Sequence, residues 1–210
     1  ANSTESVASV MSWPLLARVF DLPLADPQKD QLAKLFVETL ITHELGHAVL
    51  SCYDIAVTSR LGESAEANSL EEMKAELMGM KFIVDRAAET GDTKHLHDLY
   101  LATIACGLDY VVNRSSSNGF GTNMYSDVGK VMLASAFDTG SLVRVGDKYM
   151  IADVRAGFAG WTKMADEICA LYTDPATTPE TVVAYVRGRV GKAESNEKYR
   201  DFIAKASGNI

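Results

Sequence analysis

The sequence has few cysteines, and it lacks several patterns that mark particular classes of protein. Its three cysteines include no CxxC pair and do not form a disulfide framework. A sparse, odd set of this kind favours free thiols in a reducing compartment, and we expect a cytoplasmic protein. No Lys/Arg-rich run occurs and the net charge is −8, which argues against nucleic acid as a partner. Because no apolar run approaches the ~18 residues of a membrane span, we expect no membrane segment.

The apolar residues that are present recur mostly at steps of three and four, the spacing of helices that bury one face. The sequence is 47% hydrophobic and 23% charged, as in an ordinary globular domain. The predicted helices cover about residues 27–53, 69–90, 93–112, 124–137, 154–172, 179–190 and 197–206.

The remaining segments predict little other regular structure. Residues 54–68 are mixed and polar, and we interpret them as a connecting loop. Alternating apolar residues around Gly146-Asp147 predict a small β-hairpin over residues 141–151. We therefore expect a mainly α fold in which residues 1–210 form a single helical domain with at most a small β-hairpin. The C-terminal helices are expected within residues 150–206.

The chemistry of the chain centres on residues 43–47, which read His-Glu-Leu-Gly-His and match the HExxH pattern. Because His43 and His47 are four residues apart in a predicted helix, they face the same way. Two neutral imidazoles at this spacing bind one zinc ion, and Glu44 between them is close enough to take a proton from the water that zinc activates. The pattern therefore predicts one Zn²⁺ ion with Glu44 as the catalytic base.

Zinc peptidases of this type need a third protein ligand. Glu71, Glu72 and Glu76, on the next predicted helix, are the candidates. Glu72 and Glu76 share a face of that helix, whereas Glu71 is rotated by about 100° from Glu72. Residues 69–72 also match a capping box, in which Glu72 would accept from the amide of Ser69. The local sequence alone leaves Glu72 open between a helix cap and a zinc ligand.

A resemblance to a known family bears on this choice. HELGH together with the block Leu70-Glu71-Glu72-Met73-Lys74-Ala75-Glu76 resembles the dipeptidyl peptidase III family of zinc peptidases. It looks closest to the branch with shorter spacing, as in the peptidase-like half of some plant Nudix proteins. The match is good over about residues 40–80 and loose elsewhere.

The resemblance implies a role for each residue of the two motifs. It implies that His43, His47 and Glu72 are the zinc ligands and that Glu44 is the base. Glu71 and Glu76 would then orient the two histidines. On this resemblance we expect a zinc-dependent hydrolase of the gluzincin type, with a peptide as substrate. Residues 1–210 would then form a single helical metallopeptidase-like domain with its zinc site within residues 40–80.

The chain departs from that family in two respects. The family's enzymes are much longer and hold peptides between a helical zinc lobe and a second lobe, whereas this chain resembles the helical lobe alone. A later helix of the family also carries a histidine that stabilises the transition state. Residues 123–140 contain no histidine, and Tyr125 is the nearest chemically able replacement.

Two other functions stay open at this stage. HELGHA also occurs in peptidase families with a downstream Glu-Ala-Asp type helix, in which Glu76 would be the third ligand. Alternatively, the chain binds zinc for stability, or binds a partner, without catalysis. The oligomeric state does not follow from the sequence.

Two further features receive plainer interpretations. His95 and His97 are two residues apart and face different directions on a helix, which favours surface histidines over a second metal site. Arg114 lies in the Ser- and Gly-rich segment 113–123. A solvated arginine is favoured there over one that binds a substrate carboxylate.

Overall fold

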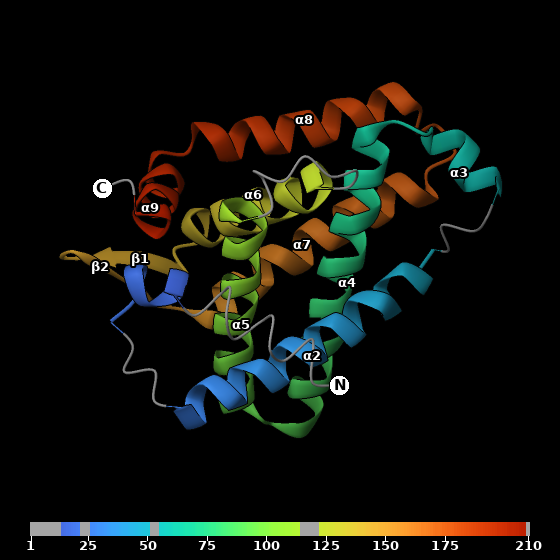
Figure 1. Cartoon of the computed structure of the whole chain (residues 1–210). Coiled ribbons are helices and arrows are strands. Elements are labelled where there is room, and N and C mark those ends of the chain that lie inside the picture. Colours follow the sequence, from blue (N-terminus) through green and yellow to red (C-terminus); the bar gives the residue numbers. More distant parts are fainter. Residues whose placement is uncertain (1–13, 22–25, 51–54, 114–121, 209–210) are drawn as a thin grey trace.

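Helices dominate the computed structural model, which describes residues 14–21, 26–50, 55–113 and 122–208 (Figure 1). Over these ranges the only sheet is one antiparallel hairpin, so the predicted mainly α fold is confirmed. No helix of the described ranges is both long enough and apolar enough to cross a membrane. A helical segment at 14–19 precedes the labelled elements, which are α2 (Asp26–Ala48), α3 (Ile55–Leu61), α4 (Ala65–Thr90), α5 (Thr93–Val112), α6 (Thr122–Asp138), β1 (Leu142–Val145), β2 (Lys148–Ile151), α7 (Val154–Thr173), α8 (Pro179–Ser195) and α9 (Glu197–Ser207).

The prediction of a connecting loop over residues 54–68 is wrong, because most of this segment is helical. α3 occupies its first half, and α4 begins at Ala65, four residues before the predicted start. The hydroxyl of Ser64 caps α4 by accepting from the amide of Ala67. Residues 65–67 read Ala-Glu-Ala, all strong helix formers, and they extend the helix toward its N-terminus.

This earlier start also overturns the capping-box interpretation of residues 69–72. Both Ser69 and Glu72 lie inside α4 rather than at its first turn. The hydroxyl of Ser69 donates instead to Oδ2 of Asp127 on α6, at 3.0 Å. The carboxylate of Glu72 therefore does not cap the start of α4.

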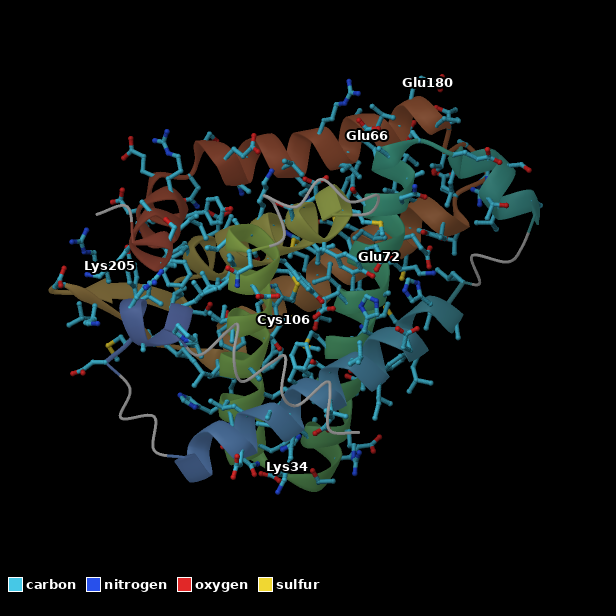
Figure 2. The ribbon with its side chains drawn as sticks, in the orientation of Figure 1. Lys34, Glu66, Glu72, Cys106, Glu180 and Lys205 are labelled. Atoms are coloured by element: carbon cyan, nitrogen blue, oxygen red, sulfur yellow. The ribbon has the colours of Figure 1, made fainter. Side chains whose placement is uncertain are left out.

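α4 is the central helix of the molecule. It contacts α2, α5, α6, α7 and α8, and its middle two turns are buried on almost every side. Figure 2 shows Glu72 in this middle part, whereas Glu66 lies at the end of α4, where it forms an ion pair with Arg187 of α8. The polar side chains of these middle turns therefore face other helices rather than solvent.

The C-terminal half follows its predictions closely. β1 pairs antiparallel with β2, and Leu142 lies opposite Ile151 across a turn at Gly146, whose φ is 60°. α5 has its predicted bounds, and α6, α7 and α9 begin and end within about two residues of theirs, the usual precision of helix ends. α8 continues past its predicted end to Ser195. Ring contacts of Phe202 with Phe20, Phe137 and Tyr149 join α9 to the hairpin and to the first described segment.

Candidate metal centre

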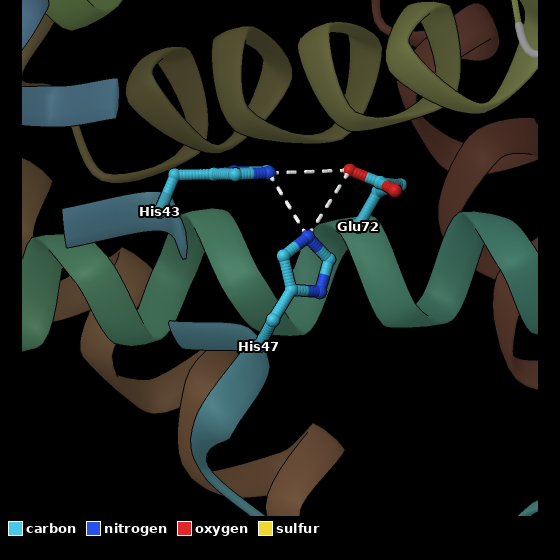
Figure 3. Close-up of side chains that lie close together, drawn as sticks. All are labelled: His43, His47 and Glu72. Atoms are coloured by element: carbon cyan, nitrogen blue, oxygen red, sulfur yellow. Dashed lines mark hydrogen bonds and ion pairs between the residues drawn. The ribbon is translucent and has the colours of Figure 1, made fainter. Parts of the chain in front are cut away.

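Two side chains of α2 and one of α4 converge on a single point (Figure 3). Nε2 of His43 lies 3.2 Å from Nε2 of His47 and 3.3 Å from Oε2 of Glu72. The third edge of this triangle, from Nε2 of His47 to Oε2 of Glu72, is 3.8 Å. Within the described ranges this is the only group of three or more His, Cys, Asp or Glu side chains close enough to hold one metal ion.

The donor atoms and two of the three edges of the triangle match a tetrahedral zinc site, and the third edge, of 3.8 Å, is longer. Ligand atoms about 2.0–2.1 Å from a tetrahedral zinc ion lie about 3.3–3.4 Å apart, which agrees with the two shorter edges. Oε2 of Glu72 is buried, and it lies within ion-pair distance of Nε2 of both histidines. A buried carboxylate needs a compensating positive charge, which the protonated ring of His43 supplies without a metal and a cation at the centre of the triangle would supply in its place. Two imidazoles and one carboxylate are also a usual donor set for zinc, so the residues fit the ion.

A close crossing of α2 and α4 brings these residues together. A Cβ atom at Gly46 of α2 would lie 2.1 Å from the carbonyl oxygen of Ala75 on α4. A Cβ atom at Gly79 of α4 would lie 2.8 Å from the carbonyl carbon of Thr42 on α2. Both separations are too short for any side chain, so glycine is needed at each position. The two glycines thus set the helix separation at which both histidines reach the carboxylate.

Two further carboxylates of α4 hold the histidine rings from behind. Nδ1 of His43 lies 2.9 Å from Oε2 of Glu76, and Nδ1 of His47 lies 2.9 Å from Oε1 of Glu71. Because a carboxylate accepts, each ring donates from Nδ1 and directs Nε2 into the triangle. The structure therefore places Glu71 and Glu76 where the orienting role would be performed. Glu76 contacts Nδ1 of His43, whereas the triangle lies on the Nε2 side of the ring. This geometry favours Glu72 over Glu76 as the third ligand.

The electrostatics of the centre depend on His43. Burial lowers the pKa of this imidazole, whereas hydrogen bonds to Glu72 and Glu76 and the negative charges of both raise it. The second effect is larger, and the pKa rises from 6.5 to about 10. In the metal-free protein His43 therefore carries a proton at neutral pH, which a metal ion must displace. The exposed fraction of the side chain is 7% for His43, 13% for Glu72 and 22% for His47, so the centre is reached from the His47 side.

The two predicted catalytic side chains lie outside this triangle. Glu44 is exposed on α2, in the same helical turn as the two histidines, so its carboxylate is open to solvent. Tyr125 is half-buried on α6, and the centre of its ring lies 5.2 Å from that of Tyr110. Its role in stabilising a transition state stays a prediction. Arg114 falls outside the described residues.

The other two histidines are not part of the centre. Nε2 of His95 lies 3.2 Å from Oε2 of Glu38 on α2, and Nδ1 of His97 lies 3.6 Å from Oδ1 of its neighbour Asp98. Over the described ranges neither belongs to a group that could hold a metal ion. His97 is exposed, in agreement with the interpretation as a surface histidine, whereas His95 is half-buried beside Glu38.

Sequence reasoning missed two residues that contact the centre. Lys74 is completely buried, and its Nζ lies 2.9 Å from Oε1 of Glu71. The signal for this burial was the apolar residues three and four positions from Lys74 on the same helix face, which are Leu70, Leu77 and Met78. Tyr172 of α7 donates its hydroxyl to Oε2 of Glu71. The two partners are 101 positions apart in the sequence, so no local pattern points to the contact.

In comparisons with known proteins, no family model, no curated protein and no solved structure matches this chain.

Proposed function

We propose that the protein is a zinc-dependent hydrolase of peptide bonds. The observation that carries the proposal is the convergence of His43, His47 and Glu72, in which a buried carboxylate oxygen faces Nε2 of both imidazoles. Three protein ligands leave one position of a tetrahedral ion for water or substrate, as catalytic rather than structural zinc sites do. The partial exposure of His47 supports access to that position from solvent.

The chemistry divides between the ion and Glu44. Zinc bound at the triangle would polarise the peptide carbonyl and lower the pKa of a water molecule. The Glu44 carboxylate would take a proton from that water while the oxygen of the water bonds to the carbonyl carbon of the peptide. Glu44 then returns the proton to the amide nitrogen as the C–N bond breaks, so one water is consumed for each bond cleaved. In this scheme His43 and His47 only bind and position.

The test of this scheme is the Glu44→Gln variant, assayed on a mixed library of short peptides by mass spectrometry. Glutamine preserves the shape of the side chain but does not take up the proton. We expect the variant to bind zinc as the unaltered protein does and to lose at least about 100-fold in turnover, the usual contribution of a general base. Full turnover by Glu44→Gln would show that Glu44 is not the base.

A second candidate function is a zinc-stabilised domain without catalysis. The specific observation in its favour is that the three ligands lie on α2 and α4, two packed helices of the core, so that one ion would cross-link them. Strong thermal stabilisation by zinc without cleavage of any library peptide would support it. Cleavage of one peptide, blocked by a chelator, would exclude it.

The setting that we propose with this function is cytoplasmic. The three cysteines include no CxxC pair and form no disulfide framework in the sequence, which favours a reducing compartment. The proposed partner is a peptide. The net charge of −8 is unfavourable for binding to phosphate backbones.

A further inference from the structure

We propose that Lys74 and Tyr172 are positioning residues of the metal centre, which hold Glu71, and through it His47, in the orientation that binds the ion. This inference rests on the zinc site of the proposed function. It concerns side chains that touch neither the ion nor the substrate, and it joins α7 to a centre built on α2 and α4.

The contacts around Glu71 fix its carboxylate at both oxygens. Oε1 lies 2.9 Å from Nδ1 of His47 and 2.9 Å from Nζ of Lys74. Oε2 accepts a hydrogen bond from the hydroxyl of Tyr172. A carboxylate held at one oxygen still rotates about its last bond, whereas one held at both does not. The acceptor that faces His47 is therefore fixed in direction, and the ring of His47 is fixed with it.

Lys74 also acts on the backbone that carries His47. Its Nζ donates to the carbonyl oxygen of Val49 at 2.7 Å and to that of His47 at 3.4 Å. Carbonyl groups at the C-terminal end of a helix lack partners within the helix. A cation there also interacts favourably with the negative end of the helix dipole. The ammonium group lies 4.6 Å from the centre of the Tyr172 ring, a cation–π distance. One lysine thus holds both the side-chain partner and the main chain of this ligand.

The arrangement is specific to one of the two histidines. Among the described residues, Glu76, the partner of His43, has no lysine or arginine within ion-pair distance. His43 is enclosed, with 7% of its side chain exposed, whereas 22% of the His47 side chain is exposed. Packing restrains the ring of His43. The ring of His47 lies at the open edge of the centre and needs the contacts that Lys74 and Tyr172 make with Glu71.

Tyr172→Phe tests the inference, because it removes one hydroxyl and keeps the ring beside Lys74. The matched control is Tyr100→Phe, which removes another buried hydroxyl, the one 2.6 Å from Oγ of Ser141. Zinc dissociation constants are measured by competition with a chromophoric chelator, and the absorption spectrum of bound cobalt(II) reports ligand geometry. We expect Tyr172→Phe to raise the zinc dissociation constant about tenfold or more and to alter the cobalt spectrum. Tyr100→Phe should change neither.

Unchanged zinc affinity and cobalt spectrum in Tyr172→Phe would overturn the inference. Equal weakening in Tyr100→Phe would also overturn it, because any lost buried hydroxyl would then have the same effect. Lys74→Met gives a second test, since it keeps the approximate volume and removes the cation; retained zinc affinity in that variant would contradict the role of Lys74. Failure of the unaltered protein to bind zinc would instead refute the zinc site itself.

Discussion

His43 lies between the carboxylates of Glu72 and Glu76, and this arrangement makes the centre sensitive to pH. Its pKa is raised from 6.5 to about 10 in the folded, metal-free protein. A group whose pKa is raised by folding stabilises the folded state fully below the unfolded value and loses that effect as pH rises through the folded value. The contribution of His43 is therefore complete below pH 6.5 and disappears as pH approaches and passes 10.

We accordingly predict opposite pH trends with and without metal between pH 6.5 and 10. The free energy of unfolding of the metal-free protein falls as pH rises, because the His43 proton is lost. Zinc affinity rises by about tenfold per pH unit, because the ion competes with one proton. Urea denaturation and chelator competition measure the two trends, with His43→Gln as control for the unfolding series. A zinc affinity independent of pH over this window would contradict the assignment.

At the scale of helices, the crossing of α2 and α4 sets the geometry of the centre. Gly46→Ala would place a methyl group against the carbonyl oxygen of Ala75, which has no room to move because it lies in a buried helix. Overpacking of this kind costs about 1–3 kcal/mol. We predict a loss of this size in the free energy of unfolding and weaker zinc binding, because the ligands would be pushed apart.

Gly188→Ala on α8 is the matched control, since a Cβ atom there meets nothing within 4 Å. Alanine in an exposed helix is favoured over glycine by about 0.5–1 kcal/mol, so this variant should be as stable as the unaltered protein or more so. Urea denaturation compares the two substitutions. A Gly46→Ala protein that is no less stable than Gly188→Ala would show that the helices do not approach as closely as described.

Local patterns predicted most of the helices because helix formation follows short-range spacing. α5 and the hairpin appear where periodicity and the turn at Gly146 placed them. The largest error fell on residues 54–68, where polar side chains suggested a loop. The sequence predicted Ser69 as the cap of this helix, whereas the cap in the structure is Ser64. Both serines precede acidic residues, and only packing against α6 distinguishes the cap from the buried hydroxyl.

At the scale of the whole molecule, the sequence predicted the part of the centre that depends on spacing. The pair His43 and His47 follows from helix geometry alone, whereas the choice of Glu72 needed a resemblance or a structure. The contact of Tyr172 with Glu71 depends on how α7 packs against α4, which no local pattern encodes. Long-range packing of this kind is what sequence periodicity leaves undetermined.

The measurement that tests the central claim most directly is the zinc content of the purified protein by elemental analysis. The same measurement is made on four variants, which are His43→Ala, Glu72→Gln, Glu76→Gln and, as a control away from the centre, His97→Ala. The account predicts one zinc ion per chain in the unaltered protein and in His97→Ala, loss of zinc in His43→Ala and Glu72→Gln, and retention with weaker binding in Glu76→Gln. An unaltered protein without zinc, or a His43→Ala protein with as much zinc as the unaltered one, would contradict it.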